Sequence, residues 1–138
     1  MNMKTHPIRL SETDHRRLRD LLAALSHDPR SVRLTGRLRD ELLRAVIEPN
    51  RPPDAAGLDC RVELLDLDTR ETEAYTLTLP ERADIALGRL SVLTPLGTAI
   101  LGYAVGDEFE WEMPGGWRRL RVTRVTPDIA VAPVASVS

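Results

Sequence analysis

The sequence predicts an α+β protein, with an antiparallel helical hairpin in its first third and a small antiparallel sheet with one short helix after it. Before residue 49, leucines recur with the period of a helix. After residue 60, apolar and polar residues alternate with the period of a strand. A proline-rich segment separates the two patterns. We therefore expect a helical hairpin at 1–48, a linker at 49–57, a sheet domain at 58–126 and a tail at 127–138.

The first predicted helix begins after Ser11, a residue type that caps helices. Asp14 follows three residues later, close to the spacing of a capping box. Pro29 disfavours helical geometry at Asp28, so we expect the helix to end there. Its apolar side chains share one face: Leu18, Leu21, Leu22 and Leu25.

The second predicted helix runs from about Leu34 to Glu48 and ends before Pro49. Its apolar face consists of Leu34, Leu38, Leu42 and Val46, with Leu43 beside it. A short connection makes two such helices antiparallel neighbours. At about 1.5 Å per residue, helices of this length extend only ~22 Å. The linker that follows contains three prolines and a glycine, which exclude helix and central strand.

The second part of the chain carries strand patterns around Val62 and Leu64 and from Tyr75 to Leu79, joined by a turn at 68–71. A short helix is predicted next. Thr94 is its expected cap, Pro95 occupies the first position, where proline is tolerated, and Gly102 ends it.

A β-hairpin is predicted around Gly115-Gly116, because two glycines between alternating segments favour a two-residue turn. This turn would pair Glu112 with Arg119 and Glu110 with Arg121. It would also pair Trp111 with Leu120 and Phe109 with Val122. Opposite charges then meet on one face of the hairpin and apolar side chains on the other.

The charge is unevenly distributed, although the chain as a whole has a net charge of -2. Residues 1–51 hold 11 Lys and Arg against 7 Asp and Glu, and residues 52–138 hold 8 against 14. The basic residues Arg16, Arg17, Arg19, Arg37 and Arg39 are interpreted as solvating side chains, with contact to an acidic partner left open. No apolar run reaches the ~20 residues of a membrane span. The start of the chain lacks the apolar stretch of a signal peptide.

The sequence shows no motif for catalysis, metal binding or phosphate binding. Cys60 is the single cysteine, which excludes an internal disulfide and suggests a small buried residue in a cytoplasmic protein. The three histidines, His6, His15 and His27, lack the i, i+4 spacing of a zinc site. The row Glu108, Glu110 and Glu112 is interpreted as an arginine-paired strand face rather than a metal site. No nucleophile elbow or phosphate-binding loop occurs. We therefore expect no catalytic residue, cofactor or metal.

Residues 91–116 resemble the C-terminal domain of the Gre transcription factors, through the Thr94-Pro95 turn into a helix, Val105-Gly106-Asp107 and the Pro114-Gly115-Gly116 hairpin. The segments 110–116 and 95–97 are more similar to the family of the regulator of nucleoside diphosphate kinase (Rnk). This resemblance covers nearly the whole chain. It implies an FKBP-like sheet domain preceded by a coiled-coil hairpin.

The resemblance also implies a function. Gre factors hold the rim of the secondary channel of bacterial RNA polymerase and deliver acidic residues on a long coiled coil for transcript cleavage. The expected docking residues are Val92, Thr94, Pro95 and Leu96. The hairpin tip, with His27, Asp28 and Arg30, is short and has one carboxylate. We therefore expect a non-enzymatic regulator that competes with Gre factors without stimulating cleavage.

Two alternatives remain open in the sequence. An FKBP-like fold suggests a peptidyl-prolyl isomerase, but only five aromatic residues are present to line a proline pocket. The family name makes nucleoside diphosphate kinase a second candidate partner, reached directly or through transcription. We expect no membrane association and no direct sequence-specific binding of nucleic acid.

Overall fold

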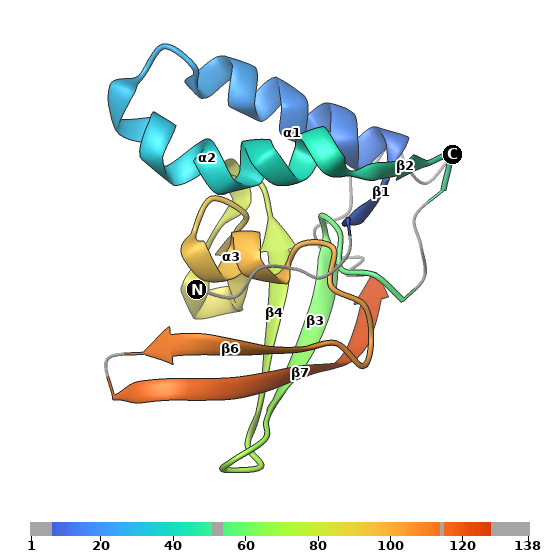
Figure 1. The fold of residues 1–138 in the computed structure, drawn as a ribbon, viewed down its shortest axis with the longest axis vertical. Coiled ribbons are helices and arrows are strands. Elements are labelled where there is room, and N and C mark those ends of the chain that lie inside the picture. Colours follow the sequence, from blue (N-terminus) through green and yellow to red (C-terminus); the bar gives the residue numbers. More distant parts are fainter. Residues whose placement is uncertain (1–6, 51–53, 114, 128–138) are drawn as a thin grey trace.

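A computed structural model describes residues 7–50, 54–113 and 115–127. Two helices lie side by side across one end of a curled five-stranded sheet, with a shorter helix between them and the sheet (Figure 1). The predicted α+β class, with helices first and sheet second, is confirmed. None of the helices in the described ranges is long and apolar enough to cross a membrane.

Helix α1 (Glu12–Leu25) begins as predicted, because the backbone N–H of Asp14 donates to Ser11 Oγ over 3.1 Å. Helix α2 (Pro29–Arg44) begins five residues earlier than predicted. Pro29, which the sequence predicts as the stop of the first helix, starts α2, since the first helical position needs no N–H donor, and Asp28 caps this helix. Their 14 and 16 residues correspond to lengths of ~21 and ~24 Å at about 1.5 Å per residue.

The predicted end of the second helix is wrong. The helix stops at Arg44, and β2 (Val46–Glu48) pairs in parallel with β1 (Arg9–Ser11). The backbone N–H of Val46 donates to the carbonyl of Ile8, so pairing replaces the next helical turn. Val46 therefore leaves the apolar face of the helix, and Leu43 is 79% exposed. The side chain of Leu34 lies outside the described part of the structure.

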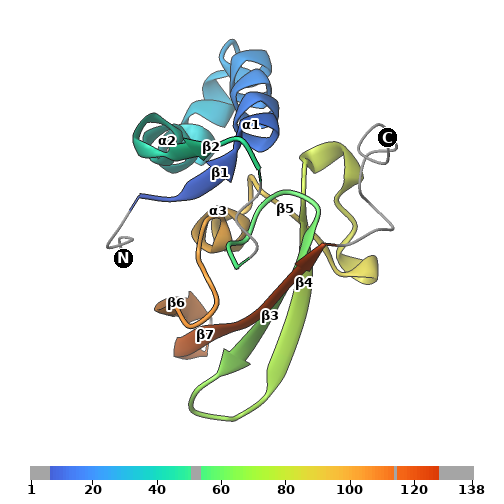
Figure 2. The same cartoon turned by 90° about the vertical axis from the view of Figure 1, so that its right-hand side faces the viewer.

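The sheet has the strand order β5-β4-β3-β7-β6. The central strand β3 (Cys60–Asp66) runs antiparallel to β4 (Thr72–Thr78) and to β7 (Gly116–Pro127). At one edge, β6 (Glu108–Met113) pairs with β7. At the other edge, β5 (Arg89–Ser91) runs parallel to β4. Two unpredicted short 3-10 helices, η1 (Pro80–Arg82) and η2 (Ile85–Leu87), connect these last two strands (Figure 2).

The predicted register of the β6–β7 hairpin is wrong by two residues. Glu110 faces Arg119, Phe109 faces Leu120 and Glu108 faces Arg121, because the ladder closes with Met113 opposite Gly116. A shift of two residues keeps every side chain on its face, so alternation alone cannot distinguish the two registers. The glutamate–arginine face is nevertheless present, with an ion pair between Arg121 and Glu108.

The register places Arg118 opposite Trp111, and Arg118 forms an ion cluster across three strands. Its guanidinium lies 2.8 Å from carboxylate oxygens of both Asp66 and Glu73. Hydrogen bonds from Arg118 and from the backbone N–H groups of Thr69 and Asp68 lower the pKa of Asp66 to about 2. Because the ordinary value is 3.8, Asp66 contributes its full stabilisation above that pH and loses it as the pH falls through 2.

Two apolar clusters form the core. The first joins the helices to the sheet, with Leu18 and Leu38 against Leu58 and Leu101. The second lies within the sheet domain, where Tyr103 and Phe109 stack with ring centroids 4.9 Å apart. Cys60 is buried, as predicted.

The predicted linker packs against the sheet domain in its second half. Ala55 and Ala56 are buried, and the backbone of Ala56 bonds to Tyr103 and to Gly102. Gly102 has a φ of +83°, and a Cβ there would lie 2.2 Å from Cβ of Ile8. The chain before α1 is therefore pressed against the end of the short helix, and only glycine fits the contact.

Candidate docking turn and hairpin tip

The predicted docking turn joins β5 to helix α3 (Pro95–Ile100). Thr94 caps this helix, since its Oγ1 accepts from the backbone N–H of Gly97 over 3.0 Å. The same hydroxyl donates to the carbonyl of Ser91 over 2.7 Å, so one side chain ties the helix to the strand end. Pro95 occupies the first helical position and is exposed. The predicted cap and first residue are confirmed.

Two further contacts fix the turn. Gly97 lies so close to the preceding strand that a Cβ there would be 2.1 Å from the carbonyl oxygen of Ser91. The buried hydroxyl of Thr98 donates to the carbonyl of Val92 over 2.7 Å. The backbone from Ser91 to Thr98 is thus held against the sheet domain, and Pro95 stands at the exposed point of a rigid turn.

The four predicted docking residues differ in exposure. Val92 is fully buried in the first core cluster, so it can support the turn but presents no surface. Leu96 is half-buried against the second cluster, and Thr94 is half-buried in its capping role. Pro95 is the member of the set that a rigid partner can contact most fully.

The hairpin tip is exposed at His27, Asp28 and Arg30. The carboxylate of Asp28 accepts from the backbone N–H of Arg30 over 2.9 Å and from the hydroxyl of Ser31 over 3.3 Å. Asp28 is therefore engaged as the cap of α2. Within the described residues, no group of three or more His, Cys, Asp or Glu side chains could hold a metal ion. The tip and α3 lie on the same half of the molecule (Figure 1).

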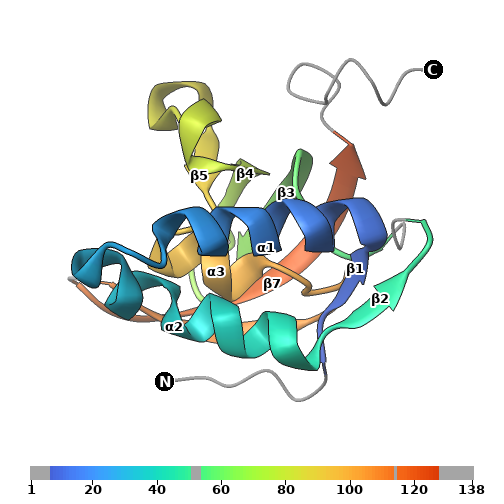
Figure 3. The same ribbon diagram turned by 90° about the horizontal axis from the view of Figure 1, so that it is seen from above.

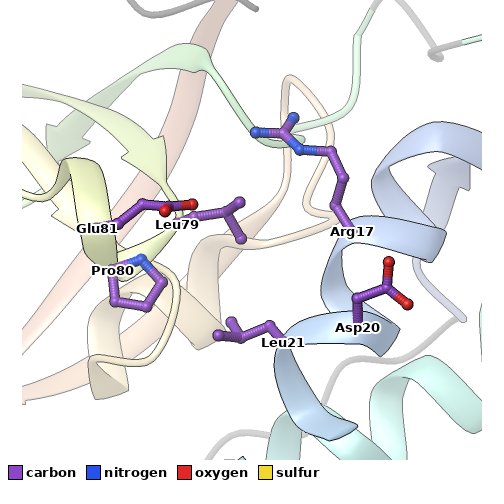
Figure 4. A pocket seen from close by; sticks show the side chains of 6 residues that line it. All are labelled: Arg17, Asp20, Leu21, Leu79, Pro80 and Glu81. Carbon is purple, nitrogen blue, oxygen red and sulfur yellow. The ribbon is translucent and has the colours of Figure 1, made fainter. Parts of the chain in front are cut away.

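A cavity of about 400 Å³ lies between α1 and the end of β4 (Figure 4). Arg17, Asp20 and Leu21 line it from α1, and Leu79, Pro80 and Glu81 line it from the opposite side. Because Thr78 pairs with Ser91, this wall continues directly beside the docking turn. The cavity combines an apolar floor with charges of both signs, and its lining includes no cysteine, serine or histidine.

Arg17 connects the hairpin to the sheet domain through buried charges. Its guanidinium lies 3.0 Å from Asp59 and 3.5 Å from Asp14, whose side chains are 1% and 3% exposed. Asp14 also accepts from the backbone N–H of Leu58 over 3.1 Å. The interpretation of Arg17 as a solvating residue is therefore wrong. The sequence held no signal for the pair, since Arg17 and Asp59 are 42 positions apart.

Comparison with known proteins shows to which family the chain belongs. Residues 51–127 match the family described as transcription elongation factor, GreA/GreB, C-terminal, and residues 6–47 match the N-terminus of Rnk. The first match alone covers more than half of the chain. The chain belongs to the GreA/GreB family. The resemblance to Gre factors and Rnk, first indicated by residues 91–116, is confirmed.

Individual GreA/GreB relatives agree with this assignment. The chain is 37% identical over 101 residues to a transcription elongation factor GreA of Desulfotalea psychrophila, covering 67% of this chain and 60% of that protein. It is 38% identical over 65 residues to the regulator of nucleoside diphosphate kinase of Escherichia coli, covering 47% and 48%. The chain thus spans about half the length of most of the curated relatives it matches.

A solved GreA/GreB structure has the same fold. The transcription elongation factor GreA/GreB from Nitrosomonas europaea is 35% identical, with a TM-score of 0.76. The match covers 86% of this chain and 98% of that one, so it includes both the helical part and the sheet. The names of these relatives are those of transcription elongation factors and of a regulator of nucleoside diphosphate kinase, rather than those of classical enzymes.

Proposed function

We propose that this protein is a non-enzymatic regulator in the cytoplasm that binds bacterial RNA polymerase at the rim of the secondary channel. The observation that carries the proposal is the turn at Thr94-Pro95. Its backbone is fixed by Thr94 and Gly97, and Pro95 is exposed where the docking turn of the Gre family is expected. Membership of the GreA/GreB family supports it. We also propose that the sheet domain is FKBP-like and that the helical hairpin is a coiled coil.

We propose further that the protein competes with Gre factors without stimulating transcript cleavage. A hard Mg²⁺ ion takes several oxygen ligands, and Asp28 is the sole carboxylate between Ser26 and Ser31. It is already committed to capping α2. The helices reach only ~21–24 Å from the hairpin base at about 1.5 Å per residue. The single carboxylate at the tip and the short length of the helices therefore both favour a protein that occupies the channel mouth without stimulating cleavage.

A binding assay with purified core RNA polymerase tests the docking turn. We expect association at micromolar concentration, and Pro95→Ala should weaken it about tenfold if Pro95 is a central contact. Pro29→Ala is the matched control, because Pro29 is also an exposed first residue of a helix. Both variants should melt at the wild-type temperature. Absence of binding by the wild type, or equal losses in the two variants, would refute the proposal.

A backtracked elongation complex tests the second part. The protein alone should leave the transcript intact, and an excess should suppress the cleavage that a Gre factor stimulates. Asp28→Ala should retain this competition, because Asp28 is assigned no role at the rim. Robust cleavage by the wild-type protein would show that the argument from reach and ligand number is wrong.

The other two functions lack a supporting observation. For a prolyl isomerase, the buried Tyr103 and Phe109 stack on each other, and the burial raises the pKa of Tyr103. Neither lines the cavity between α1 and the end of β4. Direct binding of nucleoside diphosphate kinase rests on the name of a relative. A titration of the two purified proteins would separate direct binding from an effect through transcription.

A further inference from the structure

A second surface lies on the hairpin itself, away from the docking turn. An open groove of about 330 Å³ runs between α1 and α2, which lie side by side above α3 and the sheet (Figure 3). The apolar part of its lining is Leu22, Leu42 and Leu43, and Ala23 is a small lining residue on the α1 side. Arg19 and Arg39 stand in its walls, one from each helix.

The α2 side of this groove has an apolar stripe without a described covering element. Leu43 is 79% exposed, although the adjacent Leu42 is 8% exposed in the core. Val32 lies on the same helical face and is 48% exposed. Between them, a Cβ at Gly36 would meet nothing within 4 Å, so another backbone can approach α2 closely at this point. Exposed apolar stripes of this kind mark interaction surfaces.

The charge of the groove is positive. Arg19, Arg39 and His15 line it, and no carboxylate does. In the described part of the chain, neither Arg19 nor Arg39 forms an ion pair. Arg17 and Arg37, in contrast, are paired with Asp59 and Glu41. The two groove arginines therefore remain available to an anionic partner.

We propose that this groove binds an acidic amphipathic helix of another protein. Two adjacent helices separated by small residues accept the apolar ridge of a third helix, and leucines on that ridge would cover Leu42 and Leu43. Carboxylates flanking the ridge would meet Arg19 and Arg39. The inference is independent of polymerase docking, because it uses none of the residues of the turn.

Two other occupants fit the groove less well. A second copy related by two-fold symmetry would bring Arg19 and Arg39 against the same arginines, and this like-charge contact is unfavourable. Single-stranded nucleic acid would use the arginines but would gain little from the apolar lining, since no aromatic side chain lines the groove for base stacking.

Fluorescence anisotropy with a labelled helical peptide tests the proposal. The probe is a 16-residue designed peptide with leucines at i, i+3, i+4 and i+7 and glutamates on its other faces. A second peptide has lysine in place of every glutamate, and a 15-nucleotide uridine RNA is the third probe. We expect the acidic peptide to bind at least about tenfold more tightly than the lysine peptide.

Variants of exposed residues localise the site. Leu43→Gln should weaken the acidic peptide about tenfold through lost apolar contact, and Arg39→Glu should weaken it by at least as much. The matched controls are Leu87→Gln in η2, where Leu87 is 64% exposed, and Arg61→Glu on the exposed face of β3. These controls should change the affinity less than twofold.

Four outcomes would overturn the proposal. The first two are equal binding of the two peptides and equal losses of affinity in the variants and the controls. The third is RNA binding that is tighter than peptide binding, is unchanged in Leu43→Gln and is weakened in Arg39→Glu. The fourth is a dimer in sedimentation that becomes a monomer in Leu43→Gln. Polymerase binding by Leu43→Gln should equal that of the wild type, so failure of either proposal is recognisable separately.

Discussion

Helices α2 and α3 begin with the same local sequence pattern but in different surroundings. In both, an oxygen-bearing side chain caps the helix and a proline follows: Asp28-Pro29 in one and Thr94-Pro95 in the other. Among the described residues, the side chain of the α2 cap bonds within its own first turn, to the backbone N–H of Arg30 and the hydroxyl of Ser31. The cap of α3 also bonds back to the sheet strand at Ser91.

This difference shows that a capping pattern defines where a helix starts, whereas tertiary contacts define how firmly that start is held. At the hairpin tip, every residue from Ser26 to Arg30 is exposed. The turn at Thr94 is fixed by the close approach of Gly97 to Ser91 and by the bond from Thr98 to Val92. A rigid turn loses less conformational entropy when a partner binds it.

The largest difference in the free energy of unfolding should be that between alanine variants of the two helical glycines, Gly97 and Gly36. Gly97→Ala would force a Cβ to 2.1 Å from the carbonyl oxygen of Ser91, so the turn must move. We expect a loss of about 3 kcal/mol or more in the free energy of unfolding. Gly36→Ala meets open space and should stabilise α2 by about 0.5–1 kcal/mol. Urea denaturation of both variants measures this contrast, which disappears if the turn is in fact compliant.

The anchor of the hairpin base should give the next largest effect. Arg17→Ala leaves the buried carboxylates of Asp59 and Asp14 without their cation, and we expect a loss of about 2 kcal/mol because Arg17 remains partly exposed. Arg16→Ala, one position away and exposed, should change stability by less than about 0.5 kcal/mol. Thermal melts at neutral pH compare them. Equal melting temperatures would mean that the ion pair contributes nothing.

The two caps compare the helix starts directly. Thr94→Ala removes both the bond from Gly97 and the bond to Ser91, and should cost about 1.5 kcal/mol. Asp28→Ala removes an exposed local cap and should cost about 0.5 kcal/mol. Chemical denaturation of the two variants in parallel gives the difference. If Asp28→Ala proves the more costly change, the described distinction between tip and turn fails.

The smallest effect should come from two buried threonines. Thr98→Val conserves volume but leaves the carbonyl of Val92 without this donor, which should cost about 1 kcal/mol. Thr35→Val removes a bond to the carbonyl of Ser31 within the same helix, where the backbone ladder already uses that carbonyl. We expect a cost below about 0.5 kcal/mol there. Hydrogen exchange of the α3 amides should rise in the first variant and stay unchanged in the second.

Sequence reasoning succeeded where a signal is local. The cap at Ser11, the strands around Val62 and Leu77, and the helix after Thr94 all follow from spacing within one element. The family resemblance rested on such a contiguous segment as well.

It failed where partners are distant or a pattern is degenerate. The strands β1, β2 and β5 have three residues each, too few to show alternation. A hairpin slipped by two residues keeps both of its faces, so the register of Trp111 could not be decided. The burial of Val92 and the pairing of Arg17 with Asp59 depend on tertiary packing between segments far apart in the sequence.

The parallel pairing of β1 with β2 closes the helical hairpin at its base, where Arg9 also pairs with Glu48. The segment between Ser11 and Val46 contains both helices of the hairpin. Its two ends are therefore held together by the strand pair, whatever the length of the helices. Insertion of seven residues into each helix would lengthen the arm by about 10 Å and keep nearly the same face inward. The depth to which such an arm reaches can thus change by insertion alone, while the strand pair and the sheet below it stay as they are.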